Sequence, residues 1–231
     1  MASTAGGRSV GLTRSVLPAP LRRDLATMMP SGRPVTFAAG DLMISEHARS
    51  THVLVITRGV VKITVSAPGG REVLLGLRGA DELVGELSAI SGDARSASAW
   101  ALRRVEARVI AGAVFRSYLQ THPPLMFAVL QAVVQRLREA DGRRLAFAGF
   151  DVVERVAMLL AELAQTHGRP VEGGTMIDLP ISQDEIGGAT GASREAVAKA
   201  LRRLRARGAV ATGRRQIIVQ DLAALQSMFR Q

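Results

Sequence analysis

Residues 85–99 read GELSAISGDARSASA, and this short stretch of mixed polarity divides a strand-rich half of the chain from a helical half. Its Glu86 carboxylate suits a diol hydroxyl, and its Arg95 guanidinium suits the oxygens of a phosphate. Backbone amides at the start of a short helix around residues 86–88 would add donors to an anion. The stretch predicts a cradle for a small phosphorylated ligand; a structural ion pair between Glu86 and Arg95 is the alternative interpretation.

Short runs rich in valine, isoleucine and leucine surround the cradle stretch. The runs that precede the cradle stretch are separated by turn residues, which include Gly40 and Gly59. Such spacing predicts an antiparallel sandwich or barrel. The runs occupy residues 35–44, 51–59, 60–70, 71–77, 96–101 and 105–110. Before them, residues 1–15 predict a flexible tail and residues 21–29 a short helix.

The chain becomes helical after the strands, with a short helix predicted over residues 114–120 and a long one over residues 125–148. Apolar spacing in the long helix favours a two-stranded coiled coil between two copies, and the alternative is one helix packed on its own domain. The predicted seam comprises Met126, Leu130, Val133, Leu137, Ala140, Arg144 and Phe147. Residues 150–166 predict a second amphipathic helix, and residues 171–180 a small hairpin.

Residues 181–207, ISQDEIGGATGASREAVAKALRRLRAR, predict a helix-turn-helix. Ser182 with Glu185 three residues later is a capping box that begins a helix. Gly191 supplies the turn, and Ser193 caps a second helix. The two helices would pack through apolar side chains at Ile186, Ala189, Val197 and Leu201.

The outer face of the second helix carries groups suited to DNA bases. Arg194 suits guanine O6 and N7, Glu195 suits a cytosine amino group, and Lys199 suits another guanine or a phosphate. Residues 209–212 and 216–219 predict a second hairpin, whose tip arginines would contact phosphate as a wing. The expected DNA-binding residues are Ser182, Gln183, Ser193, Arg194, Glu195, Ala198, Lys199, Arg202, Arg214 and Arg215.

The charge balance supports a polyanionic partner. The 231 residues carry a net charge of +10, and residues 181–231 hold nine Lys or Arg against four Asp or Glu. This balance suits nucleic acid first and an anionic membrane surface second, with a solvated basic surface as the alternative.

Several classes of site lack their residues in this sequence. The chain has no cysteine, which excludes disulfides, thiolate zinc sites and Cys-ligated iron–sulfur clusters. No apolar run is long enough to span a membrane. No Ser/His/Asp arrangement, metal-spaced histidine cluster or Walker loop indicates an enzyme. A haem site would need one of four histidines, and none lies in a haem-like motif: His47, His52, His122 and His167.

These motifs together resemble the catabolite activator/fumarate–nitrate regulator (Crp/Fnr) family of bacterial transcription factors. The resemblance covers nearly all of residues 35–219, most specifically through GELSAISG…ARSASA and EIGGATGASREAVAKALRRL. It implies an α+β fold with an N-terminal antiparallel β-roll of the cyclic-nucleotide-binding type, a long dimerisation helix and a C-terminal winged helix-turn-helix. The expected domains are a tail (1–15), a sensing domain (16–122), the dimerisation helix (123–149) and a DNA-binding domain (150–231).

The resemblance also implies partners and an effector. It implies a cytoplasmic homodimer that binds a palindromic operator in double-stranded DNA and contacts RNA polymerase. Positions matching Arg194, Glu195 and Lys199 read the major groove in this family, although arginine is usual at the third. The implied effector is cAMP, with no metal, haem or iron–sulfur cluster.

The cradle looks like this family's phosphate cassette. Carried over by residue, Gly85 allows close backbone approach, Glu86 accepts a hydrogen bond from the ribose 2′-OH, Arg95 neutralises the cyclic phosphate and Ser96 donates to it. The implied ligand-binding set also includes Leu87, Ser88, Ala97, Ala140 and Asp141.

Two departures bear on the ligand. The cradle is one residue shorter than in the best-known member, with Ala94 where proline is common. On the long helix, Ala140 and Asp141 stand where cAMP-responsive members place Thr-Ser against the adenine. Ala140 cannot donate or accept through its side chain, whereas Asp141 could accept from an adenine amino group or prefer another base. The alternative effectors are a cyclic dinucleotide, cGMP or none.

Overall fold

The computed structural model describes residues 32–67, 70–213 and 216–229. The predicted tail, the predicted helix at residues 21–29 and the wing-tip Arg214 and Arg215 lie outside these described residues. Contacts divide the chain between Arg136 and Leu137 into an N-terminal and a C-terminal unit. No helix among the described residues is long and apolar enough to cross a membrane.

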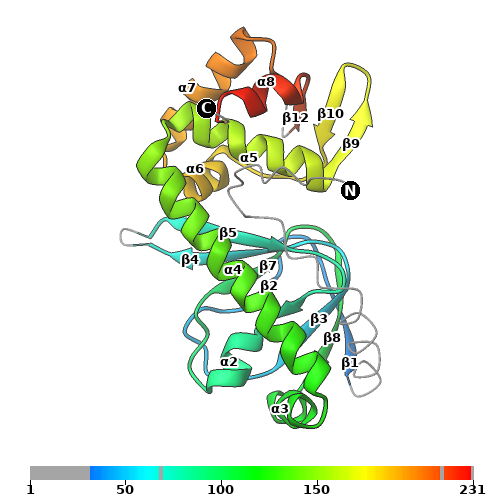
Figure 1. Ribbon diagram of the computed structural model, residues 1–231. Helices are drawn as coiled ribbons and strands as arrows, with labels where there is room; N and C mark the ends of the chain where they lie inside the picture. Colours follow the sequence, from blue (N-terminus) through cyan, green and yellow to red (C-terminus); the bar gives the residue numbers. More distant parts are fainter. Residues whose placement is uncertain (1–31, 68–69, 214–215, 230–231) are drawn as a thin grey trace, which may run out of the picture. The chain divides into compact units, whose positions relative to one another are not determined.

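The N-terminal unit is built on two four-stranded antiparallel sheets (Figure 1). One sheet has the order β1-β8-β3-β6 and the other the order β2-β7-β4-β5. The strands are β1 (Arg33–Phe37), β2 (Leu42–Ile44), β3 (Val53–Arg58), β4 (Val61–Ser66), β5 (Glu72–Arg78), β6 (Leu83–Val84), β7 (Ser98–Ala101) and β8 (Val105–Ile110). This arrangement confirms the predicted strand-rich half, and β6 is an additional strand that the sequence pattern did not indicate.

The core of this unit lies between the two sheets. Inward-facing side chains of both sheets form one buried cluster, including Leu54 and Ile56 of β3, Val61 of β4 and Val105 of β8. Side chains alternate between the two faces of a strand, so an apolar residue at every second position supplies this layer.

Three helices cover the other face of β3. They are α2 (Glu86–Ser91), α3 (Gly112–Thr121) and the 27-residue α4 (Pro123–Gly149). A second buried cluster joins them to β3 through Val53, Ala89, Phe115, Leu125 and Val129. Pro123 begins α4, where its missing N–H costs no helical hydrogen bond.

The opposite face of α4 is also apolar, and it is exposed. Met126, Phe127, Leu130, Val134 and Leu137 all present large apolar side chains to solvent. Val133 and Ala140, which the sequence placed in the seam, are half-buried instead. The exposed row therefore runs through Phe127 and Val134. It keeps the heptad spacing of the prediction but lies further round the helix, opposite the buried row of Leu125, Val129 and Ala132.

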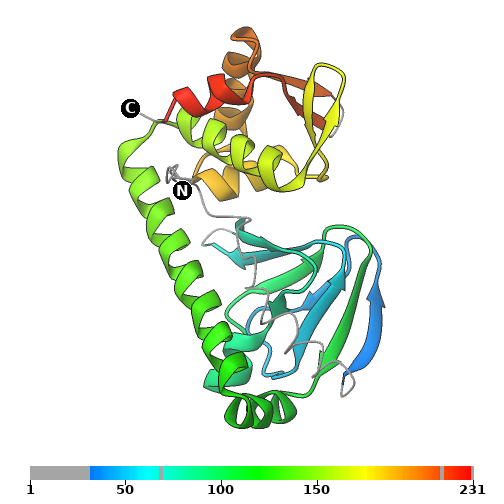
Figure 2. The same cartoon turned by 45° about the vertical axis from the view of Figure 1, so that its right-hand side comes forward.

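Among its described residues, the C-terminal unit holds the end of α4, four further helices and one small sheet, and Figure 2 shows its orange and red elements around α5. The helices are α5 (Val152–His167), α6 (Gln183–Thr190), α7 (Arg194–Ala206) and α8 (Leu222–Ser227). The sheet has the order β11-β12-β10-β9, formed by β9 (Gly168–Val171), β10 (Gly174–Ile177), β11 (Val210–Gly213) and β12 (Gln216–Val219). Both predicted hairpins are confirmed, and they pair with each other through β10 and β12.

Candidate functional site

The cradle stretch folds as a tight turn, a short helix and a returning loop. Gly85 precedes α2 with φ +87°, a left-handed conformation that side chains disfavour. A Cβ at Gly85 would lie 2.5 Å from the Arg95 guanidinium. Glycine is therefore required here because the protein's own Arg95 comes close to this backbone position. From the sequence, we had expected the glycine to allow close approach by a ligand.

Arg95 is one of the most deeply buried side chains of the chain, with 2% of its surface exposed. Its Nη1 donates to the Gly85 carbonyl (2.6 Å), its Nη2 to the His52 carbonyl (2.5 Å) and its Nε to the Ser50 hydroxyl (3.1 Å). Burial lowers the pKa of the guanidinium, and the nearby Glu86 carboxylate opposes that shift. Three of the five N–H donors of this cation are therefore bound to the protein itself.

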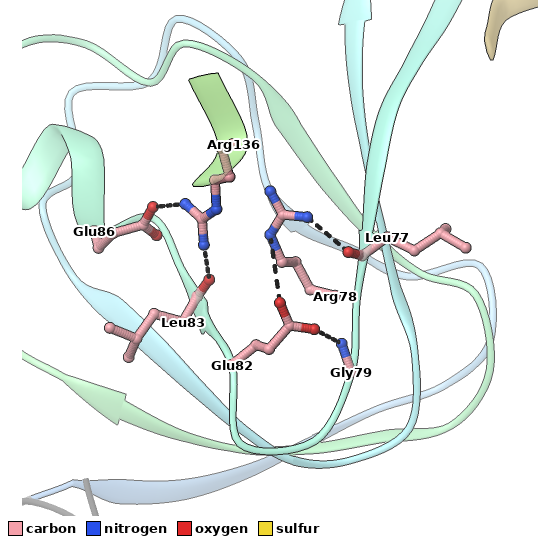
Figure 3. Close-up of polar contacts among 7 residues, drawn as sticks. All are labelled: Leu77, Arg78, Gly79, Glu82, Leu83, Glu86 and Arg136. Carbon is pink, nitrogen blue, oxygen red and sulfur yellow. Dashed lines mark hydrogen bonds and ion pairs between the residues drawn. The ribbon is translucent and has the colours of Figure 1, made fainter. Parts of the chain in front are cut away.

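Glu86, also buried, forms its ion pair with Arg136 of α4 rather than with Arg95. Figure 3 shows the Arg136 guanidinium reaching from α4 to the Glu86 carboxylate and to the Leu83 carbonyl, with an Nη2-to-oxygen distance of 3.5 Å. Neither hydrogen bond uses Nε of Arg136, which is buried and finds no hydrogen-bond partner in the described part of the chain. The Glu86 carboxylate, which the sequence predicted to bind a ligand, thus connects α2 directly to α4.

A second pair of opposite charges lies next to this contact along the chain. Arg78 Nη1 donates to the Leu77 carbonyl (2.7 Å), and its Nε lies 4.0 Å from the Glu82 carboxylate. Glu82 also accepts from the Gly79 amide at 2.5 Å. Because Glu82 immediately precedes Leu83, both pairs belong to one charged cluster beside the cradle.

The other predicted ligand residues differ in accessibility. Ser88 is buried and its hydroxyl donates to the Ala94 carbonyl (3.3 Å), which holds the loop after α2. Leu87 and Ser96 are exposed, and Ala97 is half-buried. Ala140 and Asp141 belong to the C-terminal unit, where Asp141 pairs with Arg144 on the same helix at 3.0 Å.

The predicted helix-turn-helix is confirmed in its local chemistry. The Ser182 hydroxyl accepts from the Glu185 amide (3.2 Å), and the Glu185 carboxylate accepts from the Ser182 amide (2.7 Å). Gly191 ends α6 with φ +62°, which a residue with a side chain rarely adopts. The Ser193 hydroxyl then caps α7 by accepting from the Ala196 amide at 3.2 Å.

The outer face of α7 presents its polar groups to solvent. Arg194, Glu195, Lys199 and Arg202 are exposed, whereas Ala198 is half-buried. Hydrogen bonds from the Glu195 amide and from Ser193 hold the pKa of the Glu195 carboxyl below its usual range. Ser182, Gln183 and Ser193 are exposed beside this face. The predicted packing residues are buried on the other side: Ile186, Ala189, Val197 and Leu201.

Arg155 of α5 ties the turn of the helix-turn-helix to the end of α4. Its Nε donates to the Thr190 carbonyl (2.8 Å) and its Nη1 to the Phe150 carbonyl (2.6 Å). Its guanidinium lies 5.6 Å from the centre of the Phe147 ring. Phe147, which the sequence placed in the seam, is 45% exposed, and one face of its ring contacts this arginine.

Sequence reasoning missed Arg136 and Arg155, the two arginines that connect elements. Arg136 continues the buried row of α4 through Leu125, Val129 and Ala132 at helical spacing. A lone arginine in such a row is a signal for a buried partner, because a buried charge must be paired. Arg155 carries no comparable signal, since its acceptors are backbone carbonyls.

Two family models match the chain. A cyclic nucleotide-binding domain matches residues 34–122, and a Crp-like helix-turn-helix domain matches residues 154–228. The first covers the cradle, and the second covers α6, α7 and both hairpin strands of the wing.

Characterised relatives are similar over most of their length. The CRP-like cAMP-activated global transcriptional regulator of Mycobacterium tuberculosis is 31% identical over 197 residues, covering 85% of this chain and 88% of the relative. The cyclic AMP receptor protein of Thermus thermophilus is 28% identical over 201 residues, covering 87% and 86%.

Solved structures share the fold. The c-di-GMP responsive global regulator CLP of Xanthomonas campestris has a TM-score of 0.78 at 20% identity, covering 86% of this chain and 99% of the other. A CRP/FNR-family transcriptional regulator of Thermus thermophilus has a TM-score of 0.75 at 25% identity, with the same coverage of 86% and 99%.

Proposed function

The chain belongs to the Crp/Fnr family of transcription regulators, and from this premise we propose that it is a homodimeric, sequence-specific DNA-binding regulator with cAMP as its effector. The cyclic nucleotide would bind in the N-terminal unit at the cradle. The winged helix-turn-helix would bind a palindromic operator. We further propose that it acts in the cytoplasm, contacts RNA polymerase and has no catalytic activity of its own.

The observation that carries this proposal is the buried Arg95 held against Gly85 and beside Glu86. A buried arginine fixed by carbonyls is preorganised for a phosphate, because its remaining N–H donors need no further ordering. Ser96, which is exposed, would add a hydroxyl donor to the same phosphate. Glu86 would accept from the ribose 2′-OH.

Ligand binding at Glu86 would act on α4 through Arg136. The ribose hydroxyl and Arg136 share one carboxylate as acceptor, so occupancy changes the environment of the arginine. A ligand oxygen near the buried Nε of Arg136 would give that donor the acceptor it lacks among the described residues. A ligand that contacts Arg136 in one conformation of α4 and not in another would bind the first conformation more tightly and so raise its population.

At the DNA, Arg194, Glu195 and Lys199 would read base edges in the major groove. Their exposure on one face of α7 and the cap at Ser193 support this assignment. The residues Gln183, Ser182, Ser193, Ala198 and Arg202 would flank the bases, and Arg214 and Arg215 would contact phosphate. A two-fold dimer would place two α7 helices in successive major grooves about one helical turn apart.

The exposed apolar row on α4 supports the homodimer. A helix that buries one apolar face in its own core and exposes a second requires another partner for that second face. A second copy of α4 offers the same row, as a two-fold interface requires.

A guanine nucleotide is the second candidate effector, favoured by Asp141. A carboxylate accepts hydrogen bonds and donates none when ionised, and guanine offers two neighbouring N–H donors where adenine offers its amino group alone. The candidates cGMP and a cyclic dinucleotide follow from this preference. Ala140 contributes no hydrogen bond to any base.

The experiment that tests the proposal is operator binding by fluorescence anisotropy across cAMP concentrations up to the millimolar range. We expect affinity to rise with cAMP. Unchanged affinity would remove the cAMP assignment and leave DNA binding standing. Calorimetric titration with cAMP, cGMP and a cyclic dinucleotide then identifies the base.

A matched pair of serine variants assigns the site. Ser96→Ala should weaken nucleotide binding without changing the melting temperature, because its hydroxyl is exposed. Ser117→Ala, on the exposed side of α3, should leave nucleotide binding unchanged. Equal affinities for both variants would place the ligand elsewhere.

A further inference from the structure

One charged layer interrupts the exposed apolar row of α4. Leu130, Leu137 and Leu145 are 55%, 59% and 73% exposed along this row. Asp141 lies four residues after Leu137 and four before Leu145, so it falls on the same helical face. Arg144, one turn further on, is exposed at the edge of that face.

Asp141 and Arg144 pair within their own helix, with Nη1 of the arginine 3.0 Å from the carboxylate. Both side chains remain more than half exposed, at 56% and 77%. An exposed pair of this kind contributes little to the stability of a single chain. The pair therefore has no strong structural role within its own helix, although it occupies the middle of a surface that is otherwise suited to burial.

We propose that Asp141 and Arg144 form an interchain charged layer, in which the Asp141 of each copy meets the Arg144 of the other and so selects a second copy of this chain as partner. The inference rests on the proposed homodimer. In a two-fold pairing of identical helices, equivalent positions of the two rows approach each other. Two facing aspartates would repel, and the arginines one turn away neutralise them.

The layer is self-complementary, which argues for a second copy rather than an unrelated protein. A helix with an uncharged apolar row would bury this aspartate and this arginine without partners, at the cost of desolvating both. A copy of the same helix offers an exposed Arg144 to each Asp141. Polar groups within an apolar seam fix register and partner choice at a cost in stability.

The test uses two charge reversals. Asp141→Arg places two arginines in the layer of each copy, and Arg144→Asp places two aspartates there. We expect the dimer dissociation constant of each variant, measured by analytical ultracentrifugation, to rise about tenfold or more through like-charge repulsion. Arg49→Asp, the same reversal at an exposed loop position before β3, should leave dimerisation unchanged.

Mixing the two variants distinguishes an interchain layer from an intrachain pair. An interchain layer gives complementary charges only in the mixed dimer, so native mass spectrometry should show heterodimers well above the statistical half. A statistical mixture would overturn the inference. Circular dichroism of each variant confirms that α4 is intact.

A separate variant tests the premise. Leu137→Glu, which leaves the layer unchanged, should dissociate the dimer if the apolar row is the interface. A dimer that survives Leu137→Glu would refute the proposed dimer face itself. Dissociation by Leu137→Glu combined with statistical mixing would refute the charged layer alone.

Discussion

The cradle and helix α7 differ in how their charged side chains are placed. In the cradle, Arg95 and Glu86 are both buried, at 2% and 3% exposure, and both are bound to the protein. On α7, Arg194, Lys199 and Arg202 are exposed. The ion pair between Arg194 and Asp184 spans 3.7 Å with both side chains about two-thirds exposed.

Because the charged side chains are buried in the cradle and exposed on α7, we expect the two regions to bind their partners in different ways. Under the proposed function, a ligand at the cradle would share the Glu86 carboxylate with Arg136, so we expect its binding to be coupled to the conformation of the elements that hold these side chains. Under the proposed function, DNA at α7 would displace water and the exposed ion pair between Arg194 and Asp184, so we expect its binding to depend on how the two copies of α7 lie in the proposed dimer. The proposed sensing region is therefore the one whose charged side chains are already bound to the protein.

The largest expected effect is loss of the buried arginine. Arg95→Leu leaves the Gly85 and His52 carbonyls without their donors and should lower the free energy of unfolding by about 2–4 kcal/mol. Urea denaturation measures this change, and calorimetry should show loss of nucleotide binding.

The matched substitution on α7 is Arg202→Leu. It should change the free energy of unfolding by less than about 0.5 kcal/mol while weakening DNA binding. Equal losses in the free energy of unfolding for Arg95→Leu and Arg202→Leu would contradict the expected difference between a buried and an exposed arginine.

The next effect concerns base readout. Arg194→Ala should cost about 1–3 kcal/mol in operator affinity, measured by fluorescence anisotropy, and relax specificity at one base pair. Arg207→Ala, just beyond the C-terminal end of α7, serves as the control for general charge loss. An equal effect on operator and scrambled DNA would show that Arg194 contacts phosphate instead.

A double-mutant cycle compares the two ion pairs directly. For Glu86→Gln with Arg136→Met we expect a coupling free energy of about 1–2 kcal/mol from urea denaturation, because the pair is buried. For Asp184→Ala with Arg194→Ala we expect less than about 0.5 kcal/mol. Similar coupling in both cycles would contradict the distinction.

The smallest expected effect is a pH dependence at the cradle. Burial and the Arg95 charge lower the pKa of the half-buried His52 imidazole. The unfolded chain, with its histidine near about 6.5, then binds more protons than the folded chain just below that pH. Stability should therefore fall as pH decreases through this window. His52→Gln should flatten that fall in a series of melting temperatures.

Local chemistry made the helix-turn-helix predictable. The capping box at Ser182 and Glu185, the glycine turn at Gly191 and the cap at Ser193 each depend on residues within four positions of one another. The strand runs were predictable for the same reason, except β6, whose two residues are too few to show a period.

Long-range contacts were not predictable from the same patterns. Glu86 and Arg136 are 50 residues apart, and nothing near either residue identifies the other as its partner. The acceptors of Arg95 are backbone carbonyls, which have no sequence signature. The seam was displaced because the sequence did not show which face of α4 packs on the core of its own unit, and Val133, at the flank of that face, is half-buried whereas Val134 is exposed.

The division of the chain inside α4 has a consequence for local unfolding. None of the residues 133–145, all of them described by the structure, is buried, whereas Ala132 and Ala146 at either side are. An isolated helical segment of this length is marginal in water. In a single chain these backbone amides should exchange with solvent faster than those of either flanking turn. The order of the middle of α4 then depends on few contacts within the chain, chiefly the ion pair of Arg136 with Glu86, and on whatever covers its exposed row.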